Sequence, residues 1–259
     1  MNDTVTRRLD TADLEARVKS MYELVALEPD QPFHFETGRG LAEHLGYPVA
    51  GLDAIPAEAI ASFAGVGYFL DLADLASGET VLDLGSGSGT DSLLAARSVG
   101  STGTVTGVDM TRAQLAKATQ LADEADFGNV EFVEGYIERP PATAGSVDCV
   151  ISNGVINLSA DKPAVFRSAA AALRPGGRLA IADIVSATQL PEGVTCDASL
   201  WAACIGGAAQ RDDYLAMIED AGFSVETVRD NDYRFVSDRA VGATSAYGVT
   251  SVSILARRT

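Results

Sequence analysis

A glycine-rich turn follows a short apolar run in the first half of the chain. The run Thr-Val-Leu-Asp-Leu at residues 80–84 precedes Gly-Ser-Gly-Ser-Gly at residues 85–89, and helical periodicity begins at Thr90. Glycines between a strand and a helix allow a tight bend and a close approach of the backbone to a ligand. The turn therefore indicates a site for a nucleotide-containing cofactor. A nicotinamide site, a flavin site and a plain turn have similar glycine patterns.

Two carboxylates flank this turn. Asp109 ends the next predicted strand, about 20 residues beyond the loop, where an acid accepts hydrogen bonds from the two hydroxyls of a ribose. Asp83 lies directly before the glycines, and the loop lacks the G-x-G-x-x-G spacing of dehydrogenases. An acid at Asp83 favours a cationic cofactor such as a sulfonium over a pyrophosphate, although a strand-end hydrogen-bond acceptor is the alternative role.

The thiols are the other groups with chemical potential. The three cysteines, Cys149, Cys196 and Cys204, are an odd number without the spacing of a zinc site. We therefore expect reduced thiols, no disulfide framework and no metal site. Cys149 lies within the apolar segment Val-Asp-Cys-Val-Ile-Ser, which favours a small buried side chain.

Composition narrows the class of protein and of partner. The 259 residues include 36 acidic and 19 basic side chains, for a formal net charge of −17, so a nucleic acid backbone would be repelled. The N-terminal residues lack the apolar core of a secretory signal, and no segment has the length of a membrane span. We expect a cytoplasmic protein that binds neither nucleic acid nor membrane. The sequence gives no indication of its oligomeric state.

The elements that must position these groups alternate between strand and helix. From residue 80 onward the pattern predicts strands at 80–84, 104–110, 130–135, 147–152, 178–185, 223–230 and 250–258, with helices between most of them. This alternation predicts a parallel sheet. A turn is expected at Pro175-Gly176-Gly177. Ahead of the sheet we expect an amphipathic helix over residues 10–27, a partly helical loop over 28–46 and a helix over 57–63.

Residues 81–91 and 104–110 resemble motifs I and II of class I S-adenosylmethionine-dependent methyltransferases. The similarity covers most of residues 80–185. The resemblance implies S-adenosylmethionine as the cofactor and assigns residues to it. Asp83 would lie near its cationic end, Asp109 would hold the ribose, Met110 would pack on the adenine and Asn153 would line the methyl-transfer face. The remaining cofactor contacts implied are Gly85, Ser86, Gly87 and Gly89 around the methionine moiety and Gly135, Tyr136 and Ile137 at the adenine edge.

The resemblance also implies a Rossmann-like α/β fold with three α/β/α layers and a mostly parallel seven-stranded sheet whose last strand is antiparallel. We expect residues 1–70 to form an N-terminal helical cap and residues 71–259 the cofactor-binding domain. Residues 186–210 would be an insertion on the substrate side.

Longer segments, about half the chain, are similar to the arsenite methyltransferase-like group. They include the stretches Val150 to Gly177 and Leu200 to Ala208. The group's chemistry requires thiolates, because trivalent arsenic is a soft centre held by sulfur. Cys204 matches a family cysteine that binds arsenic and is our catalytic candidate. Gly154 stands where the family has another cysteine, and Cys196 is a candidate replacement.

The acceptor therefore has two candidate classes. The first is a complex of trivalent arsenic with thiols. The second is a small organic metabolite, methylated on carbon, oxygen or sulfur in a pocket that Gly154 opens. A non-catalytic module that binds S-adenosylmethionine is a third possibility, which an assay for turnover distinguishes from the other two.

Overall fold

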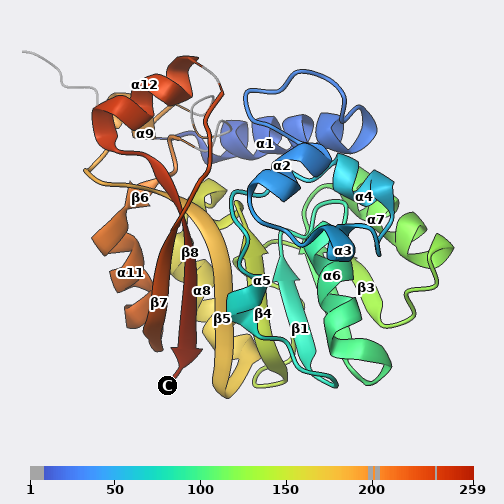
Figure 1. Cartoon of the computed structure of the whole chain (residues 1–259). Helices are drawn as coiled ribbons and strands as arrows, with labels where there is room; N and C mark the ends of the chain where they lie inside the picture. Colours follow the sequence, from blue (N-terminus) through green and yellow to red (C-terminus); the bar gives the residue numbers. More distant parts are fainter. Residues whose placement is uncertain (1–8, 198–200, 202–204, 237) are drawn as a thin grey trace, which may run out of the picture.

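The computed structural model describes residues 9–197, 201, 205–236 and 238–259, in which a central sheet lies between layers of helices (Figure 1). Seven strands lie in the order β3-β2-β1-β4-β5-β8-β7. They are β1 (Thr80–Leu84), β2 (Thr104–Asp109), β3 (Val130–Glu134), β4 (Val147–Asn153), β5 (Leu173–Ser186), β7 (Phe223–Asn231) and β8 (Thr250–Arg258). β8 is antiparallel to both β5 and β7, and the pairs from β3 to β5 are parallel.

The predicted seven-stranded sheet with an antiparallel last strand is confirmed. One small strand was not expected: β6 (Ala209–Gln210) pairs with β5 beside this path, so the described part of the chain forms eight strands. β6 is only two residues long and both residues are partly buried. It therefore has no alternating apolar pattern by which the sequence could reveal it.

Side-chain alternation along the strands creates the two helical layers. In β1, Val81 contributes to the core that includes α6, whereas Leu82 and Leu84 contribute to the core that includes α8 and α11. Successive side chains of a strand point to opposite faces, so a strand that is apolar on both faces must be covered twice. The covering helices are α5 (Leu70–Ala73), α6 (Thr90–Val99), α7 (Arg112–Glu124), α8 (Lys162–Ala172) and α11 (Arg211–Asp220). Near the C-terminus, α12 (Asp238–Tyr247) lies beyond the end of the sheet (Figure 1).

The N-terminal segment lies across the end of the sheet toward which β1 points (Figure 1). It contains α1 (Thr11–Leu27), α2 (Gly38–His44), α3 (Val49–Leu52) and α4 (Ala57–Ala61). α1, α2 and α4 agree with the expected elements, whereas α3 was not expected. The carboxylate of Asp10 caps α1 by accepting hydrogen bonds from the backbone N–H groups of Ala12 and Asp13. The division of the chain at residue 70 stays a prediction.

One predicted turn lies inside a strand. β5 begins at Leu173, so it includes Pro175-Gly176-Gly177, which the sequence placed before it. Val147 pairs with Leu173, but Cys149 already pairs with Arg178, so β5 bulges where Gly176 has a φ of +75°. A bulge absorbs the extra residues without ending the strand. The boundary predicted at Arg178 is therefore wrong, because the pairing resumes on both sides of the turn.

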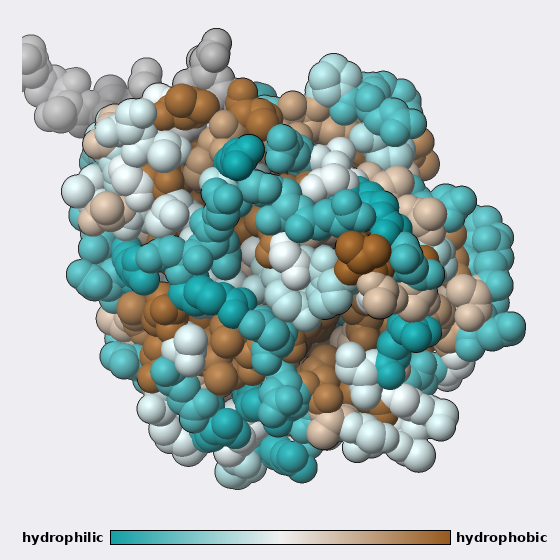
Figure 2. Space-filling view, viewed as in Figure 1, coloured by the Kyte–Doolittle hydropathy of each residue, from teal (hydrophilic) through white to brown (hydrophobic). Residues whose placement is uncertain are grey.

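No helix in the described ranges is long and apolar enough to cross a membrane. Figure 2 shows polar residues spread over one face of the molecule, with hydrophobic residues surfacing in separate patches between them.

Candidate active site

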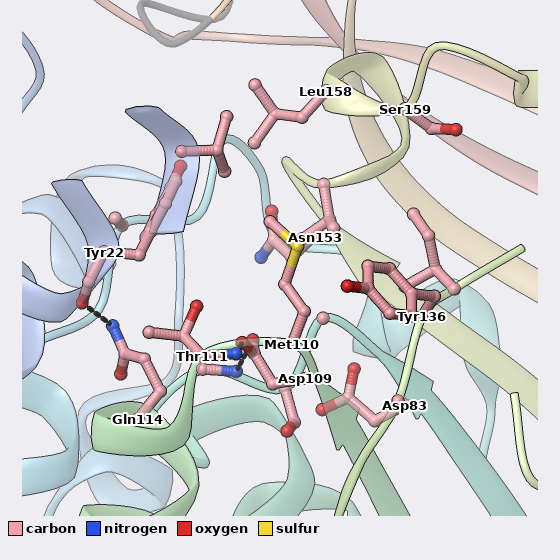
Figure 3. A pocket seen from close by; sticks show the side chains of 18 of the residues that line it. Tyr22, Asp83, Asp109, Met110, Thr111, Gln114, Tyr136, Asn153, Leu158 and Ser159 are labelled. Carbon is pink, nitrogen blue, oxygen red and sulfur yellow. Dashed lines mark hydrogen bonds between the residues drawn. The ribbon is translucent and has the colours of Figure 1, made fainter. Parts of the chain in front are cut away.

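A cavity of about 600 Å³ lies where the parallel strands end. Its size is that of a pocket for a small molecule or cofactor. Of the residues expected at the cofactor, those that line it are Asp83, Gly85, Ser86, Gly87, Asp109, Met110, Gly135, Tyr136, Ile137 and Asn153. Figure 3 draws Asp83, Asp109 and Gln114 on one side of the cavity and Leu158 and Ser159 on the other.

The glycine loop is held against the end of β2. The backbone N–H groups of Gly85 and Ser86 both donate to the carbonyl of Val108, at 2.8 and 3.0 Å. Gly85 has a φ of +79°, and a Cβ there would stand 2.4 Å from a methyl of Val155. A Cβ on Gly87 would meet only Gln114, at 3.8 Å. Gly85 thus permits close packing of the wall, whereas Gly87 leaves open space beside the cavity.

Gly89 also has a structural role. With a φ of +92° it is the residue that caps α6, and its neighbours Ser88 and Thr90 line the cavity. A Cβ there would stand 2.8 Å from the ring of Phe132, so this glycine lets the start of α6 pack against β3. Its position beside the methionine moiety stays a prediction.

Asp109 is fixed by two backbone amides. Its Oδ2 accepts a hydrogen bond from Gly87 N–H at 3.0 Å and its Oδ1 accepts one from Thr111 N–H at 2.8 Å. Burial raises the pKa of this carboxyl, while the bonds from Thr111 and Gly87 lower it. Because each carboxylate oxygen has two lone pairs, both oxygens retain acceptor capacity toward the cavity.

A pair of acids lies behind the loop. Asp83 is 2% exposed and accepts a hydrogen bond from the Ser92 hydroxyl at 2.5 Å. Burial, together with the negative charges of Asp91 and Asp109, raises its pKa to about 8. Asp91 is 7% exposed, and burial raises its pKa to about 6. Both carboxyl groups line the cavity, so a cation bound there would favour their ionised forms.

Asn153 joins the end of β4 to the N-terminal segment. Its Oδ1 accepts from Val66 N–H at 2.8 Å, and its Nδ2 lies 2.9 Å from the Tyr47 hydroxyl and 3.0 Å from Asp91 Oδ2. Tyr47 in turn donates to the other oxygen of Asp91 at 2.6 Å. Sequence analysis missed Tyr47 and Asp91. Asp91 had a signal in its place in the first turn of α6, but nothing local marked Tyr47.

Helix α1, in the part of the chain where a helical cap was expected, closes one side of the cavity. Thr11, Leu14, Glu15, Val18 and Tyr22 all line it. The Tyr136 hydroxyl donates to Glu15 Oε1 at 2.7 Å and accepts from Lys19 Nζ at 3.1 Å. Lys19 also lies over the Tyr136 ring, 5.1 Å from its centre.

On the side of α7, Gln114 donates to the Tyr22 carbonyl at 2.8 Å (Figure 3), and Lys117 donates to the Ala26 carbonyl at 3.0 Å. Tyr136 thus holds the N-terminal half of α1, and α7 holds its C-terminal half.

Opposite the acids, a far wall is formed by Val155, Leu158, Ser159 and Ala160. The turn that carries it is anchored by a buried carboxyl: Asp183 accepts from Asn157 Nδ2 and from the Tyr214 hydroxyl, each at 2.5 Å. The Ser159 hydroxyl donates to Glu138, which also lines the cavity.

Gly154 lies behind this far wall and does not open it. It is buried, has a φ of +70° and does not line the cavity. A Cβ there would stand 3.1 Å from a methyl of Val66. The expected enlargement of the pocket by Gly154 is wrong, because the side chain of Val66 occupies the adjacent space.

The described thiols lie away from the cavity. Cys149 is fully buried in β4, and burial raises its pKa to about 12. Cys196 follows α9 (Glu192–Thr195) and is partly exposed. Cys204, the catalytic candidate, lies outside the described residues. None of the described residues that line the cavity is a cysteine.

The charge and hydrogen-bonding capacity of the cavity fit S-adenosylmethionine. Among the described residues, its acidic lining consists of Glu15, Asp83, Asp91, Asp109 and Glu138, against one basic residue, Arg139. This excess of carboxyl groups suits a cofactor with a sulfonium, an ammonium and a ribose diol. The Ser86 hydroxyl is buried at the cavity without a hydrogen-bond partner among the described residues. A polar ligand would satisfy it.

A metal is not needed to explain these acids. Within the described ranges, no group of three or more His, Cys, Asp or Glu side chains has the arrangement of a metal site. The absence of a resident metal stays a prediction for the whole chain.

Comparisons with known proteins agree with this geometry. A family described as a methyltransferase domain matches residues 75–222. An arsenite methyltransferase of Halobacterium salinarum is 39% identical over 225 residues, which are 86% of this chain and 57% of that protein. The chain thus spans little more than half the length of this curated relative.

Among solved structures, an arsenic(III) S-adenosylmethionine methyltransferase from Chlamydomonas reinhardtii is 32% identical with a TM-score of 0.66, covering 80% of this chain and 71% of that one. A geranyl diphosphate C-methyltransferase from Streptomyces coelicolor is 19% identical with a TM-score of 0.70, covering 97% and 100%. The second similarity concerns the fold alone.

Proposed function

This chain belongs to the class I S-adenosylmethionine-dependent methyltransferases, in their arsenite methyltransferase-like group, and from this we propose that it methylates trivalent arsenic presented as a thiol complex. The observation that carries methyl transfer is the acid-lined cavity at the strand ends, with Asp109 held by two backbone amides. The similarity to arsenic enzymes supports the choice of acceptor. We place the reaction in the cytoplasm, where thiols stay reduced.

Different residues around the cavity contact different parts of the cofactor. Asp109 accepts hydrogen bonds from the ribose hydroxyls, Met110 packs on the adenine, and Gly135, Tyr136 and Ile137 lie at the adenine edge. Asp83 and Asp91 face the ammonium and sulfonium charges. When S-adenosylmethionine is bound, the chemistry it supplies is an electrophilic methyl group on a positively charged sulfur. The protein contributes proximity, alignment and electrostatic fit.

Helix α1 keeps water out of this site. Its cavity-facing side chains include Leu14 and Val18, which are 4% and 3% exposed. The bonds of Tyr136 to Glu15 and Lys19 hold the helix over the adenine side. Exclusion of water strengthens the attraction between the acids and a sulfonium and limits hydrolysis.

The acceptor would need sulfur ligands from two sources. Cys204 supplies one thiolate to the arsenic, and small thiols supply the others, because Gly154 offers none. In methyl transfer the arsenic lone pair would form the new bond to the methyl carbon as the carbon–sulfur bond breaks. The positive charge would pass from sulfur to the methylated arsenic, and neutral S-adenosylhomocysteine would be released. No side chain need remove a proton from arsenic in this step.

A second candidate is methylation of a small organic metabolite. The observation that favours it is the absence of a cysteine among the described lining residues, together with a methyl of Val66 that lies 3.1 Å from where a Cβ on residue 154 would stand. The acceptor would then be a carbon, oxygen or sulfur nucleophile that fits between the acids and the far wall.

The experiment is an assay for S-adenosylhomocysteine with trivalent arsenic plus glutathione, run beside a panel of small organic acceptors. Turnover with arsenic that Cys204→Ser abolishes would support the proposal, with Cys149→Ser as the matched control. Turnover only with an organic acceptor would replace it by the second candidate. Cofactor binding without any turnover would favour a non-catalytic binding module.

A further inference from the structure

Lys162, the first residue of α8, is a buried cation that the proposed chemistry does not use. Its side chain is 6% exposed. Lysine is almost never buried to this extent without a compensating partner. Its Nζ donates to the carbonyl of Ser159 at 2.9 Å and lies 4.6 Å from the centre of the Trp201 ring. Both contacts satisfy an ammonium: the carbonyl as an acceptor, and the indole face by a cation–π interaction.

These two partners belong to different parts of the molecule. Ser159 is in the far wall of the cavity, and its hydroxyl donates to Glu138. Trp201 belongs to the segment 186–210, where its indole N–H donates to the Thr195 carbonyl at 2.7 Å. Lys162 therefore connects the cavity wall to Trp201.

The segment is also packed closely on the same wall. A Cβ on Gly207 would stand 1.9 Å from the carbonyl oxygen of Asn157, and a Cβ on Gly206 would stand 2.3 Å from the Trp201 ring. Such approaches need glycine. The position of the segment relative to the far wall thus depends on contacts around Trp201.

We propose that Lys162, as an ammonium between Ser159 and Trp201, is a positioning residue that holds Trp201 against the far wall for the methyl acceptor. Its effect on the acceptor rests on the proposed function, since it assumes that the far wall faces the acceptor. Its effect on Trp201 does not.

The charges around Lys162 set the pH range in which the contact exists. Burial lowers its pKa to about 8, while the carboxyls of Asp183 on β5 and Glu138 in the loop after β3 act in the opposite direction. The ammonium is present below this pH and is lost above it. A neutral amine keeps a hydrogen bond but has no charge to interact with the indole face.

The first test uses Trp201 as a reporter, because it is the only tryptophan of the chain. Its fluorescence is recorded between about pH 6.5 and about pH 9.5, a range centred on the lowered pKa. We expect a transition with a midpoint near 8 that disappears in Lys162→Met, whereas Lys162→Arg gives a constant signal at its low-pH level. The same transition in Lys162→Met would overturn the proposal.

The second test separates positioning from cofactor binding. For whichever acceptor the wild type methylates, Lys162→Met should raise the acceptor KM roughly tenfold, consistent with the loss of a desolvated cation–π contact, and Lys162→Arg should restore most of it. The Kd of S-adenosylhomocysteine should change less than about twofold. An equal loss of both affinities would overturn the positioning role.

Trp201→Phe provides the matched partner for a double-mutant cycle, because a smaller ring weakens the same contact. If the losses from the two substitutions add without coupling, the proposal fails. If the wild type methylates nothing in the acceptor panel, the proposed function has failed, and Lys162 is then judged by the fluorescence titration alone.

Discussion

The two sides of the cavity are built in different ways. The cofactor side consists of the ends of β1 and β2 and the loop between β1 and α6, held by backbone amides and one carboxylate, Asp109. The far wall consists of one short turn, fixed by side chains that include Asp183 from β5 and Lys162 at the start of α8. Contacts made by backbone atoms are little affected when side chains are substituted. A wall held by side-chain contacts can be altered by a single substitution. This difference suits one cofactor and a variable acceptor.

The cofactor side should be most sensitive at Asp109. Asp109→Ala should weaken the binding of S-adenosylhomocysteine at least about tenfold, because charge-assisted hydrogen bonds to ribose contribute roughly 1.5–3 kcal/mol each. Titration calorimetry measures the loss, and Asp123→Ala on the outer end of α7 is the control. An unchanged affinity for S-adenosylhomocysteine would show that Asp109 does not bind the ribose, and the cofactor side would then lack the carboxylate that distinguishes it from the far wall.

Restoring the family cysteine tests the region behind the far wall. Gly154→Cys should lower the free energy of unfolding by roughly 1–3 kcal/mol, because the residue has a positive φ and its Cβ approaches Val66. Thermal unfolding measures this. Adding Val66→Ala should relieve only the steric part. A variant as stable as the wild type would show that a thiol fits there without rearrangement.

The acid pair predicts a pH dependence of cofactor binding. The pKa values of Asp83 and Asp91, about 8 and about 6, lie above the ordinary carboxyl value, so the folded apoprotein retains protons that the unfolded chain has lost. The stability of the apoprotein from these groups is therefore greatest below pH about 3.9 and decreases as pH rises toward 8.

A cation in the cavity favours the ionised acids, so cofactor affinity should rise between about pH 5.5 and about pH 8, by up to roughly tenfold, with release of protons. Calorimetry in buffers of different ionisation enthalpy detects that release. Asp91→Asn should reduce it. Proton uptake on binding would contradict the assignment of the acids to the cationic end.

The smallest effect is expected where α1 meets the adenine side. Glu15→Gln removes the charge that binds Lys19 and the Tyr136 hydroxyl, and such exposed interactions contribute about 0–1 kcal/mol. The KM for S-adenosylmethionine should rise about two- to fivefold with kcat nearly unchanged. Glu23→Gln, on the same helix, is the control, and an equal effect there would point to loss of helix charge in general.

The sequence predicted features that depend on local contacts better than those that depend on contacts between distant segments. The loop at residues 85–89, Asp109 and most strand positions were recognisable, because each depends on neighbours within one strand-loop-helix unit. The bond of Tyr47 to Asp91 spans 44 positions, and that of Tyr136 to Glu15 spans 121, so no local pattern could reveal them.

Two glycines illustrate why residue type alone is not enough. Gly89 and Gly154 both have positive φ, and a Cβ on each would meet a side chain from elsewhere in the chain, Phe132 and Val66. A glycine signals that space or backbone freedom is needed. Only the fold shows whether a cofactor or another part of the chain occupies that space.

The antiparallel strand β8 has a consequence for how the protein is made. It lies between β5, which ends at Ser186, and β7, so one edge of β5 lacks its long partner until the ribosome has synthesised Thr250–Arg258. An open edge with buried apolar residues such as Ile181 and Ile184 can pair with other chains. The nascent chain thus has a vulnerable period during translation, when chaperones that bind exposed strands would matter most.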